Sequence, residues 1–270
     1  MFPAKFDYLS PTRIDVALEI LANHDDVKIL AGGHSLLPLM KLRLATPLLL
    51  VDISKIEALS FIEDRGTHLA IGSLTLLADI VASKILTSGA PLLVQIASQV
   101  GDPAVRHRAT IGGSIVHGDC AGDLPAAMLA LGATFVMQGP MGERRIRAVD
   151  FFTGFLETAI FPSEILTYVL IDKFSGSWFY EKFNRRAQDW AIVGVAVLRE
   201  ETTRIALINM SSTPVRAFEA EKALQNGATG PEASMLVATH LDPPADSNAT
   251  SEFRRHLAQV ITRRALEAVS

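Results

Sequence analysis

Two pairs of adjacent glycines constrain this chain more than any other feature of its sequence. The first pair lies in residues 31–35 (Ala-Gly-Gly-His-Ser) and the second in residues 110–114 (Thr-Ile-Gly-Gly-Ser). Each pair stands where a short apolar run is expected to end and the chain to turn. Because glycine has no Cβ, main-chain N–H groups in such turns can converge on an anion. Two such turns favour a ligand with two linked phosphates, and a dinucleotide is the first candidate.

Each turn taken alone is equally typical of an ordinary connection between a strand and a helix. Neither segment matches G-x-G-x-x-G or G-x-x-x-x-G-K-[ST], so the standard nicotinamide and ATP sites are disfavoured. In both segments a hydroxyl accompanies the glycines, from Ser35 in the first and from Thr110 in the second. The use of both turns by one pyrophosphate is therefore a more specific hypothesis than either turn alone.

Composition restricts the class of protein. The chain has 270 residues, of which 49% are hydrophobic and 20% charged, which indicates a compact globular protein of one or two domains. The net charge of −4 favours neither a nucleic acid nor an anionic membrane as a partner. The apolar stretches are far shorter than the roughly 20 residues of a membrane span, and the first residues do not resemble a signal peptide. A single cysteine, Cys120, excludes an internal disulfide and favours a reduced, cytoplasmic setting.

The hydrophobic pattern predicts three regions. The first is a small β-α-β-α-β unit that ends near residue 57, with Thr12 as the N-cap of its first helix. Its later elements are expected at 27–30, 36–42 and 48–53. The second region begins with a hairpin at 58–62 and 68–71, continues with helices at 74–82, 91–100 and 126–131, and includes strands at 134–137 and 165–171. A polar loop is expected at 117–122, and Asp123 is expected to cap the helix that follows it.

The third region begins at about residue 174, where the pattern of predicted elements changes. Three strands are predicted at 178–183, 191–198 and 204–210, followed by helices at 217–224, 233–239 and 251–269. Strands that precede helices in this way are typical of a separate α+β domain.

Three further groups of residues invite chemical hypotheses. His117 and Cys120 suggest a metal or a nucleophile, but no other ligands follow at a metal-binding spacing, so no metal site is predicted. Asp123 either caps a helix or accepts hydrogen bonds from a polyol, and both roles are compatible. Trp190, which follows a basic cluster that includes Lys182, either covers a planar ring or packs in the core, and local sequence favours packing.

Long motifs now identify a resemblance. Residues 31–47 (Ala-Gly-Gly-His-Ser-Leu-Leu-Pro through Ala-Thr-Pro) resemble the first flavin-binding segment of the FAD-binding medium subunits of molybdenum hydroxylases. Residues 101–106, 110–114 and 123–126 resemble the second segment. The likeness extends over nearly the whole chain, through residues 151–154, 164–166, 180–186, 253–255 and 263–266.

The resemblance implies an α+β fold. A two-lobed FAD-binding domain of the vanillyl-alcohol-oxidase type (lobes 1–57 and 58–173) would precede a small C-terminal domain (174–270) with an antiparallel sheet and helices. It also implies that the two glycine segments hold the pyrophosphate of FAD, that Asp123 binds a sugar hydroxyl, and that Lys182 lies near the polar edge of the flavin. The implied cofactor-binding residues are Ala31, Gly32, Gly33, His34, Ser35, Leu36, Thr110, Ile111, Gly112, Gly113, Ser114, His117, Asp123, Ile165, Lys182 and Trp190. Ser114 stands where the family usually has asparagine.

The function implied by the resemblance is that of an oxidoreductase subunit. FAD on this chain would accept electrons from two [2Fe–2S] clusters on a small partner subunit and pass them to an external acceptor. The molybdenum cofactor would lie on a large subunit, and the assembly would be a dimer of heterotrimers. Two alternatives remain: a self-sufficient FAD-dependent oxidase or reductase with His117 as its base, and a nucleotide-binding module without flavin. The resemblance also implies that the substrate pocket lies on the large subunit and not on this chain.

Overall fold

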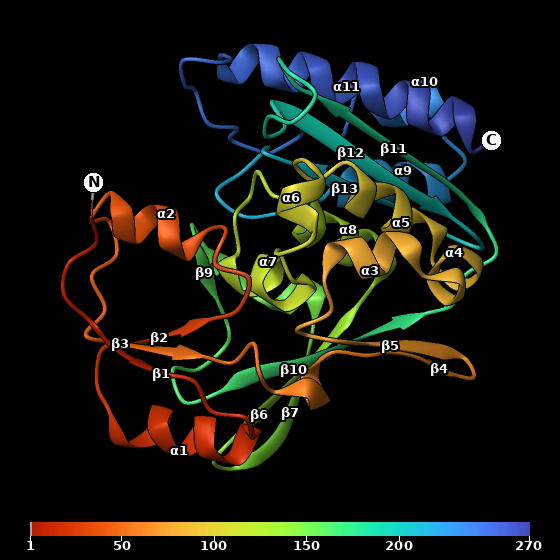
Figure 1. The fold of residues 1–270 in the computed structure, drawn as a ribbon. Helices are drawn as coiled ribbons and strands as arrows, with labels where there is room; N and C mark the ends of the chain where they lie inside the picture. The colour runs from red at the N-terminus through yellow and green to blue at the C-terminus, as the bar shows by residue number, and fades with distance from the viewer. Residues whose placement is uncertain (1) are drawn as a thin grey trace.

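A computed structural model of the chain describes residues 2–270, and its first unit is a three-stranded parallel sheet (Figure 1). The unit contains β1 (Asp7–Leu9), α1 (Ile14–Asn23), β2 (Val27–Leu30), α2 (Leu36–Lys41) and β3 (Leu49–Asp52), with strand order β1-β3-β2. The predicted β-α-β-α-β unit is therefore confirmed. The N-cap prediction was wrong: α1 begins after Arg13, whose extended backbone precedes the helix without a side-chain cap, and not after Thr12.

The second unit is a five-stranded antiparallel sheet with helices on one side (Figure 1). Its strand order is β4-β5-β10-β6-β7, from β4 (Ile62–Arg65), β5 (His68–Gly72), β6 (Thr134–Gly139), β7 (Gly142–Arg147) and β10 (Ile165–Asp172). The helices are α3 (Leu77–Ala82), α4 (Lys84–Gly89), α5 (Pro91–Ser98), α6 (Pro103–Arg106), α7 (Ile111–His117) and α8 (Asp123–Leu131). A short ribbon of β8 (Phe152–Gly154) and β9 (Glu157–Thr158) and the 3₁₀ turns Glu57–Leu59 and Ala148–Asp150 complete the unit.

Several boundaries in this unit differ from the prediction. The hairpin begins at Ile62, because residues 57–59 form a 3₁₀ turn where a strand was expected. The short helices α4 and α6 were not predicted, and Pro103 opens α6 behind the side-chain cap of Asp102. Helix α8 begins at Asp123 with Gly122 as its N-cap and no side-chain cap, so the prediction that Asp123 caps this helix was wrong.

The third unit is a four-stranded antiparallel sheet with helices on both faces. It contains β11 (Ser177–Phe183), β12 (Val193–Arg199), β13 (Thr203–Ile208) and β14 (Val215–Arg216), paired in sequence order. The helices that follow are α9 (Phe218–Gln225), α10 (Gly230–Ser234) and α11 (Ser251–Ala268). Figure 1 shows α11 running along the outer face of the sheet, while α8 lies against the other face.

The alternation of side chains along β12 explains why this strand is buried on both faces. Val195 and Val197 pack into the apolar cluster formed with α10 and α11. Ala196 and Leu198 point the other way, into the large cluster that includes α5 and α8. One continuous core therefore joins the second and third units. The α+β fold class is confirmed, whereas the boundaries after residues 57 and 173 stay predictions.

Candidate functional site

A pocket of about 500 Å³ lies between the parallel sheet and the helices of the second unit. Its lining comes from the end of β2 and the turn that follows, from the start of α7, and from β10. It brings together the two glycine pairs, which are far apart in the sequence. Of the predicted site residues, the pocket is lined by Ala31, Gly32, Gly33, His34, Ser35, Leu36, Thr110, Gly112, Gly113, Ser114, His117 and Ile165.

The first glycine pair forms a cluster of free donors, here called the N–H nest. Within residues 2–270, the main-chain N–H groups of Gly32 through Leu36 donate to no protein acceptor. Gly33 has a φ of +79°, a left-handed conformation that L side chains rarely adopt. The Ser35 side chain precedes α2 without capping it. Residues 32–36 are half-buried or exposed, and Leu36 begins α2, where a helix leaves its first N–H groups without intrahelical partners. Five successive free donors beside a pocket, with a positive φ at Gly33, are typical of an anion-binding site.

The second glycine pair is not a turn, and the prediction of a second N–H nest was wrong. Residues 111–117 form α7, and Thr110 caps it by accepting a hydrogen bond on Oγ1 from the Gly113 N–H at 3.1 Å. The Gly112 N–H donates to the Ser73 carbonyl oxygen at 2.9 Å, and the Ser114 N–H to that of Thr110 at 3.1 Å. The main-chain N–H groups of this segment already donate to protein acceptors. The glycines here therefore allow close packing and do not supply free donors.

The two glycine segments can pack closely because glycine has no Cβ. A Cβ on Gly32 would collide with the carbonyl oxygen of Arg108, so the N–H nest packs directly on the chain that leads to α7. A Cβ on Gly113 would lie 2.9 Å from Thr110 Oγ1 and 3.9 Å from the Ala31 Cβ across the pocket. The two glycine segments thus face each other because neither carries side-chain atoms at the contact.

At Gly112 this packing decides whether a substitution by alanine raises or lowers the free energy of unfolding. Glycine to alanine inside a helix ordinarily gains up to about 1 kcal/mol. Here the new Cβ would lie 2.6 Å from the Ser73 Cβ and 2.7 Å from the Ser73 carbonyl oxygen, which is main chain of a buried segment. We expect Gly112→Ala to lower the free energy of unfolding by about 1–3 kcal/mol, measured by urea denaturation. An unchanged or higher urea midpoint would contradict this close packing.

The charge of the pocket suits an anion. None of its lining residues is acidic, whereas Lys28, His34 and His117 are all present. The remainder is largely apolar, including Ile29, Ile165 and the other side chains Leu44, Ile53, Leu74 and Leu166. Free donors, basic side chains and a largely apolar lining together fit a phosphate joined to a flat ring.

Ser73 is a residue that sequence reasoning missed. Its side chain is 4% exposed, lines the pocket and has a hydroxyl with no hydrogen-bond partner within residues 2–270. A buried hydroxyl without a protein partner is uncommon, and at a pocket such a group binds water or a ligand. The sequence offered no signal for it, because the missing partner is visible only in three dimensions.

Asp123 and Lys182 lie apart from this pocket in a buried cluster. The Asp123 carboxylate accepts hydrogen bonds from the Tyr180 hydroxyl at 2.6 Å and from Lys182 Nζ at 3.0 Å. Lys182 Nζ also donates to the Gln99 carbonyl oxygen at 2.9 Å. Burial raises the pKa of Asp123 against the opposing effect of Lys182, and burial beside Asp123 raises the pKa of Tyr180 well above its ordinary value. This cluster connects α5 and α8 to β11.

Ile111, another of the predicted site residues, is fully buried and does not line the pocket described above.

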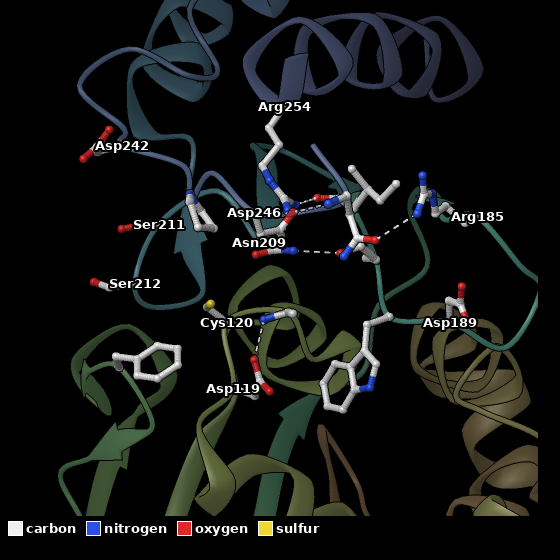
Figure 2. Close-up of a pocket in the computed structure, with 17 residues that line it drawn as sticks. Asp119, Cys120, Arg185, Asp189, Asn209, Ser211, Ser212, Asp242, Asp246 and Arg254 are labelled. Atoms are coloured by element: carbon white, nitrogen blue, oxygen red, sulfur yellow. Dashed lines mark hydrogen bonds and ion pairs between the residues drawn. The ribbon is translucent and has the colours of Figure 1, made fainter. Parts of the chain in front are cut away.

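A second pocket, with a volume of about 660 Å³, is shown in Figure 2. Trp190 lines it and is 58% exposed, so the packing interpretation of this side chain was wrong. The two pockets are neighbours along two segments: His117 lines the first and Asp119 the second, while Leu156 lines the first and Phe155 the second. The N–H nest and Trp190 thus line two pockets that are next to each other along the segments 117–119 and 155–156.

The histidine of this region lies beside a carboxylate, and the cysteine is a buried thiol. His117 Nε2 lies 4.0 Å from Asp119 Oδ2. Cys120 is buried, and burial raises the pKa of its thiol, which disfavours the nucleophilic thiolate. Residues 2–270 contain no group of three or more histidine, cysteine or carboxylate side chains arranged to hold a metal. Over the same residues, no helix combines the length and the apolar character that a membrane crossing requires.

Two family models together match almost the whole chain. Residues 4–172 match the family model of the FAD binding domain in molybdopterin dehydrogenase, and residues 178–269 match that of the CO dehydrogenase flavoprotein C-terminal domain.

Individual relatives cover the whole chain. The carbon monoxide dehydrogenase medium chain of Hydrogenophaga pseudoflava is 36% identical over 99% of this chain and 98% of its own length. The glyceraldehyde dehydrogenase medium chain of Sulfolobus acidocaldarius is 32% identical over 100% of both. A solved carbon monoxide dehydrogenase from H. pseudoflava, which lacks the Mo-pyranopterin moiety of its cofactor, superposes with a TM-score of 0.95 at 38% identity, covering 100% of this chain and 98% of that one. The chain thus belongs to the FAD-binding medium subunits of the molybdenum hydroxylases and is an oxidoreductase subunit.

Proposed function

We propose that this chain is the electron-transfer flavoprotein subunit of a molybdenum hydroxylase, with FAD extended across the two adjoining pockets. The observation that carries the proposal is the N–H nest: five successive free donors at a pocket without acidic residues. These donors, with the hydroxyls of Ser35 and Thr110, would hold the pyrophosphate. The apolar wall that includes Ile165 would lie beside the adenine.

The remaining assignments follow from the second pocket. Trp190 would stand against the isoalloxazine, with His117 near the passage between the two pockets. Asp123 and Lys182 would support the site by tying α8 to β11, since their polar atoms bind each other. Bound FAD supplies reversible two-electron and one-electron redox chemistry, and the protein supplies orientation and electrostatics.

The assembly is also part of the proposal. A small iron–sulfur subunit with two [2Fe–2S] clusters would deliver electrons, and a large subunit would hold the molybdenum cofactor and the substrate. Relatives named as medium chains support such partners, and we propose a dimer of heterotrimers. We propose a cytoplasmic location because the single cysteine is kept as a buried thiol.

A visible absorption spectrum of the material purified through a tag on this chain tests the proposal. Flavin bands together with iron–sulfur absorbance and co-purifying larger and smaller subunits would support it. Flavin on a lone chain that turns over a substrate would replace it with the self-sufficient oxidase. A protein that stays colourless even after FAD is added would overturn the flavin assignment.

Ser73 supplies a finer test of where FAD lies. We expect Ser73→Ala to weaken FAD binding by about tenfold, because a hydrogen bond from a buried hydroxyl to a ligand is worth about 1–1.5 kcal/mol. Fluorescence titration of the FAD-free chain measures the dissociation constant.

Thr75→Val is the matched control for Ser73→Ala. The Thr75 hydroxyl donates to the Phe61 carbonyl oxygen at 2.9 Å, so its loss should lower stability and leave FAD affinity unchanged. Equal FAD affinities of Ser73→Ala and the unmodified chain would place the ligand away from Ser73.

A further inference from the structure

The loop that joins β11 to β12 carries Trp190, and its main chain is fixed from outside the loop. Trp190 itself is 58% exposed, but Ala191 and Ile192 are buried. Their carbonyl oxygens accept hydrogen bonds from two side chains that belong to other elements. Asn209 Nδ2 donates to the Ala191 oxygen at 2.8 Å, and Arg254 Nη1 donates to the Ile192 oxygen. Figure 2 shows both side chains at the wall of the second pocket.

Asn209 occupies a position whose conformation few residues tolerate. It follows the end of β13 with a φ of +62°, in the left-handed region where asparagine is enriched among non-glycine residues. In this conformation its main-chain N–H donates to the Cys120 carbonyl oxygen at 2.8 Å. One residue thereby binds both the loop after α7 and the loop of Trp190, and both loops line the second pocket.

Arg254 holds the next carbonyl from α11. Its side chain is fully buried, and its Nη2 donates to Asp246 Oδ2 at 2.8 Å, while Nε has no partner within residues 2–270. A buried guanidinium with a single carboxylate partner, itself 43% exposed, is poor evidence of a gain in stability. Its rigid fork instead fixes geometry, because the same planar group binds the loop of Asp246 and the loop of Trp190.

We propose that Asn209 and Arg254 are positioning residues that set the place of the Trp190 indole at the second pocket. Both side chains also line the pocket, but the effect proposed here reaches the bound flavin through Trp190. The carbonyl oxygens of the two residues after Trp190 both accept side-chain hydrogen bonds. The main chain at Trp190 is therefore restrained, although its side chain is exposed. The effect on the flavin rests on the function proposed above, whereas the effect on Trp190 does not.

The test uses the full chain with Trp178→Phe, which leaves Trp190 as the single tryptophan of the two in the sequence. The protein is labelled with 5-fluorotryptophan and observed by ¹⁹F NMR, with and without FAD. Asn209→Gly tolerates the left-handed backbone and keeps the N–H to Cys120, so it removes only the side-chain donor. Asn209→Asp keeps the size and the local rigidity but places an oxygen, which cannot donate, against the Ala191 carbonyl.

We expect both variants to broaden the Trp190 resonance at least twofold or to split it. They should also change the visible circular dichroism of bound FAD while its dissociation constant stays within about threefold. Asn226→Gly, at the end of α9 and away from the second pocket, is the control with the same substitution and should change neither signal.

A single unshifted resonance in both Asn209 variants overturns the positioning role. A changed resonance with unchanged circular dichroism of the flavin overturns the action on the cofactor. Failure of the proposed function looks different: the unmodified chain would bind no FAD, and the ¹⁹F comparison of the FAD-free proteins would still decide the effect on Trp190.

Discussion

Gly33→Val is expected to abolish the retention of FAD. Gly33 has a φ of +79°, so a β-branched residue there is strained, and its first side-chain atom would lie 2.9 Å from Leu37 Cδ1. Relief of the strain requires the main chain to rotate, which turns neighbouring N–H groups of the nest away from the pocket. Because these donors would hold the pyrophosphate together, we expect a loss of FAD affinity of at least a hundredfold, measured as flavin content per chain after gel filtration.

Gly66→Val separates the loss of the nest from general backbone strain. Gly66 has a φ of +84°, similar to that of Gly33, but it lies in the turn between β4 and β5, where a Cβ would meet no atom within 4 Å. The two variants therefore carry similar local strain, and only one alters the pocket. We expect Gly66→Val to keep its full flavin content despite a lower melting temperature. Normal flavin content in Gly33→Val would refute the pyrophosphate assignment.

The two glycine pairs show how far sequence reasoning reaches. A pair after a short apolar strand predicted the first turn correctly, because the strand must end and glycine permits the positive φ at Gly33. The same pattern misled at residues 110–114, where Thr110 caps a helix and the glycines only make room. At Gly112 the main chain of Ser73 approaches from another part of the chain, so the glycine is needed for space. No local pattern records such an approach.

Long-range pairing explains the other misses. Asp123 was expected to cap a helix because acidic residues favour that position, but Tyr180 and Lys182 bind its carboxylate in the folded chain. Trp190 was expected to pack in the core on local grounds, whereas the resemblance placed it at the flavin and the structure leaves it at a pocket. The α+β architecture followed from periodicity and from the resemblance, since strand alternation is a local property.

Lys182→Met is expected to lower the free energy of unfolding by about 3–5 kcal/mol near neutral pH, since removal of one partner from a buried ion pair leaves the other charge uncompensated. Lys182 and Asp123 have side chains only 3% and 9% exposed. Lys173→Met is the matched control: Lys173 pairs with Asp64 at 2.6 Å, but both groups face solvent, so we expect a much smaller change. If urea denaturation gave the same decrease in the free energy of unfolding for both variants, the buried pair would contribute no more to stability than the exposed one.

The pH dependence of Lys182→Met identifies the charge that is left behind. The pKa of Asp123 is already raised by burial, and Lys182 is the first of the groups that oppose this rise. Without the lysine the folded pKa rises further, so the folded state holds a proton that the unfolded state releases above the ordinary aspartate pKa. Stability must then fall as pH increases from that value through the raised one. We expect Lys182→Met to lose stability steeply over this range, whereas Asp123→Asn/Lys182→Met, with no charge to bury, should recover most of the loss and lack the slope. A double variant as pH-dependent as the single one would assign the titration to another group.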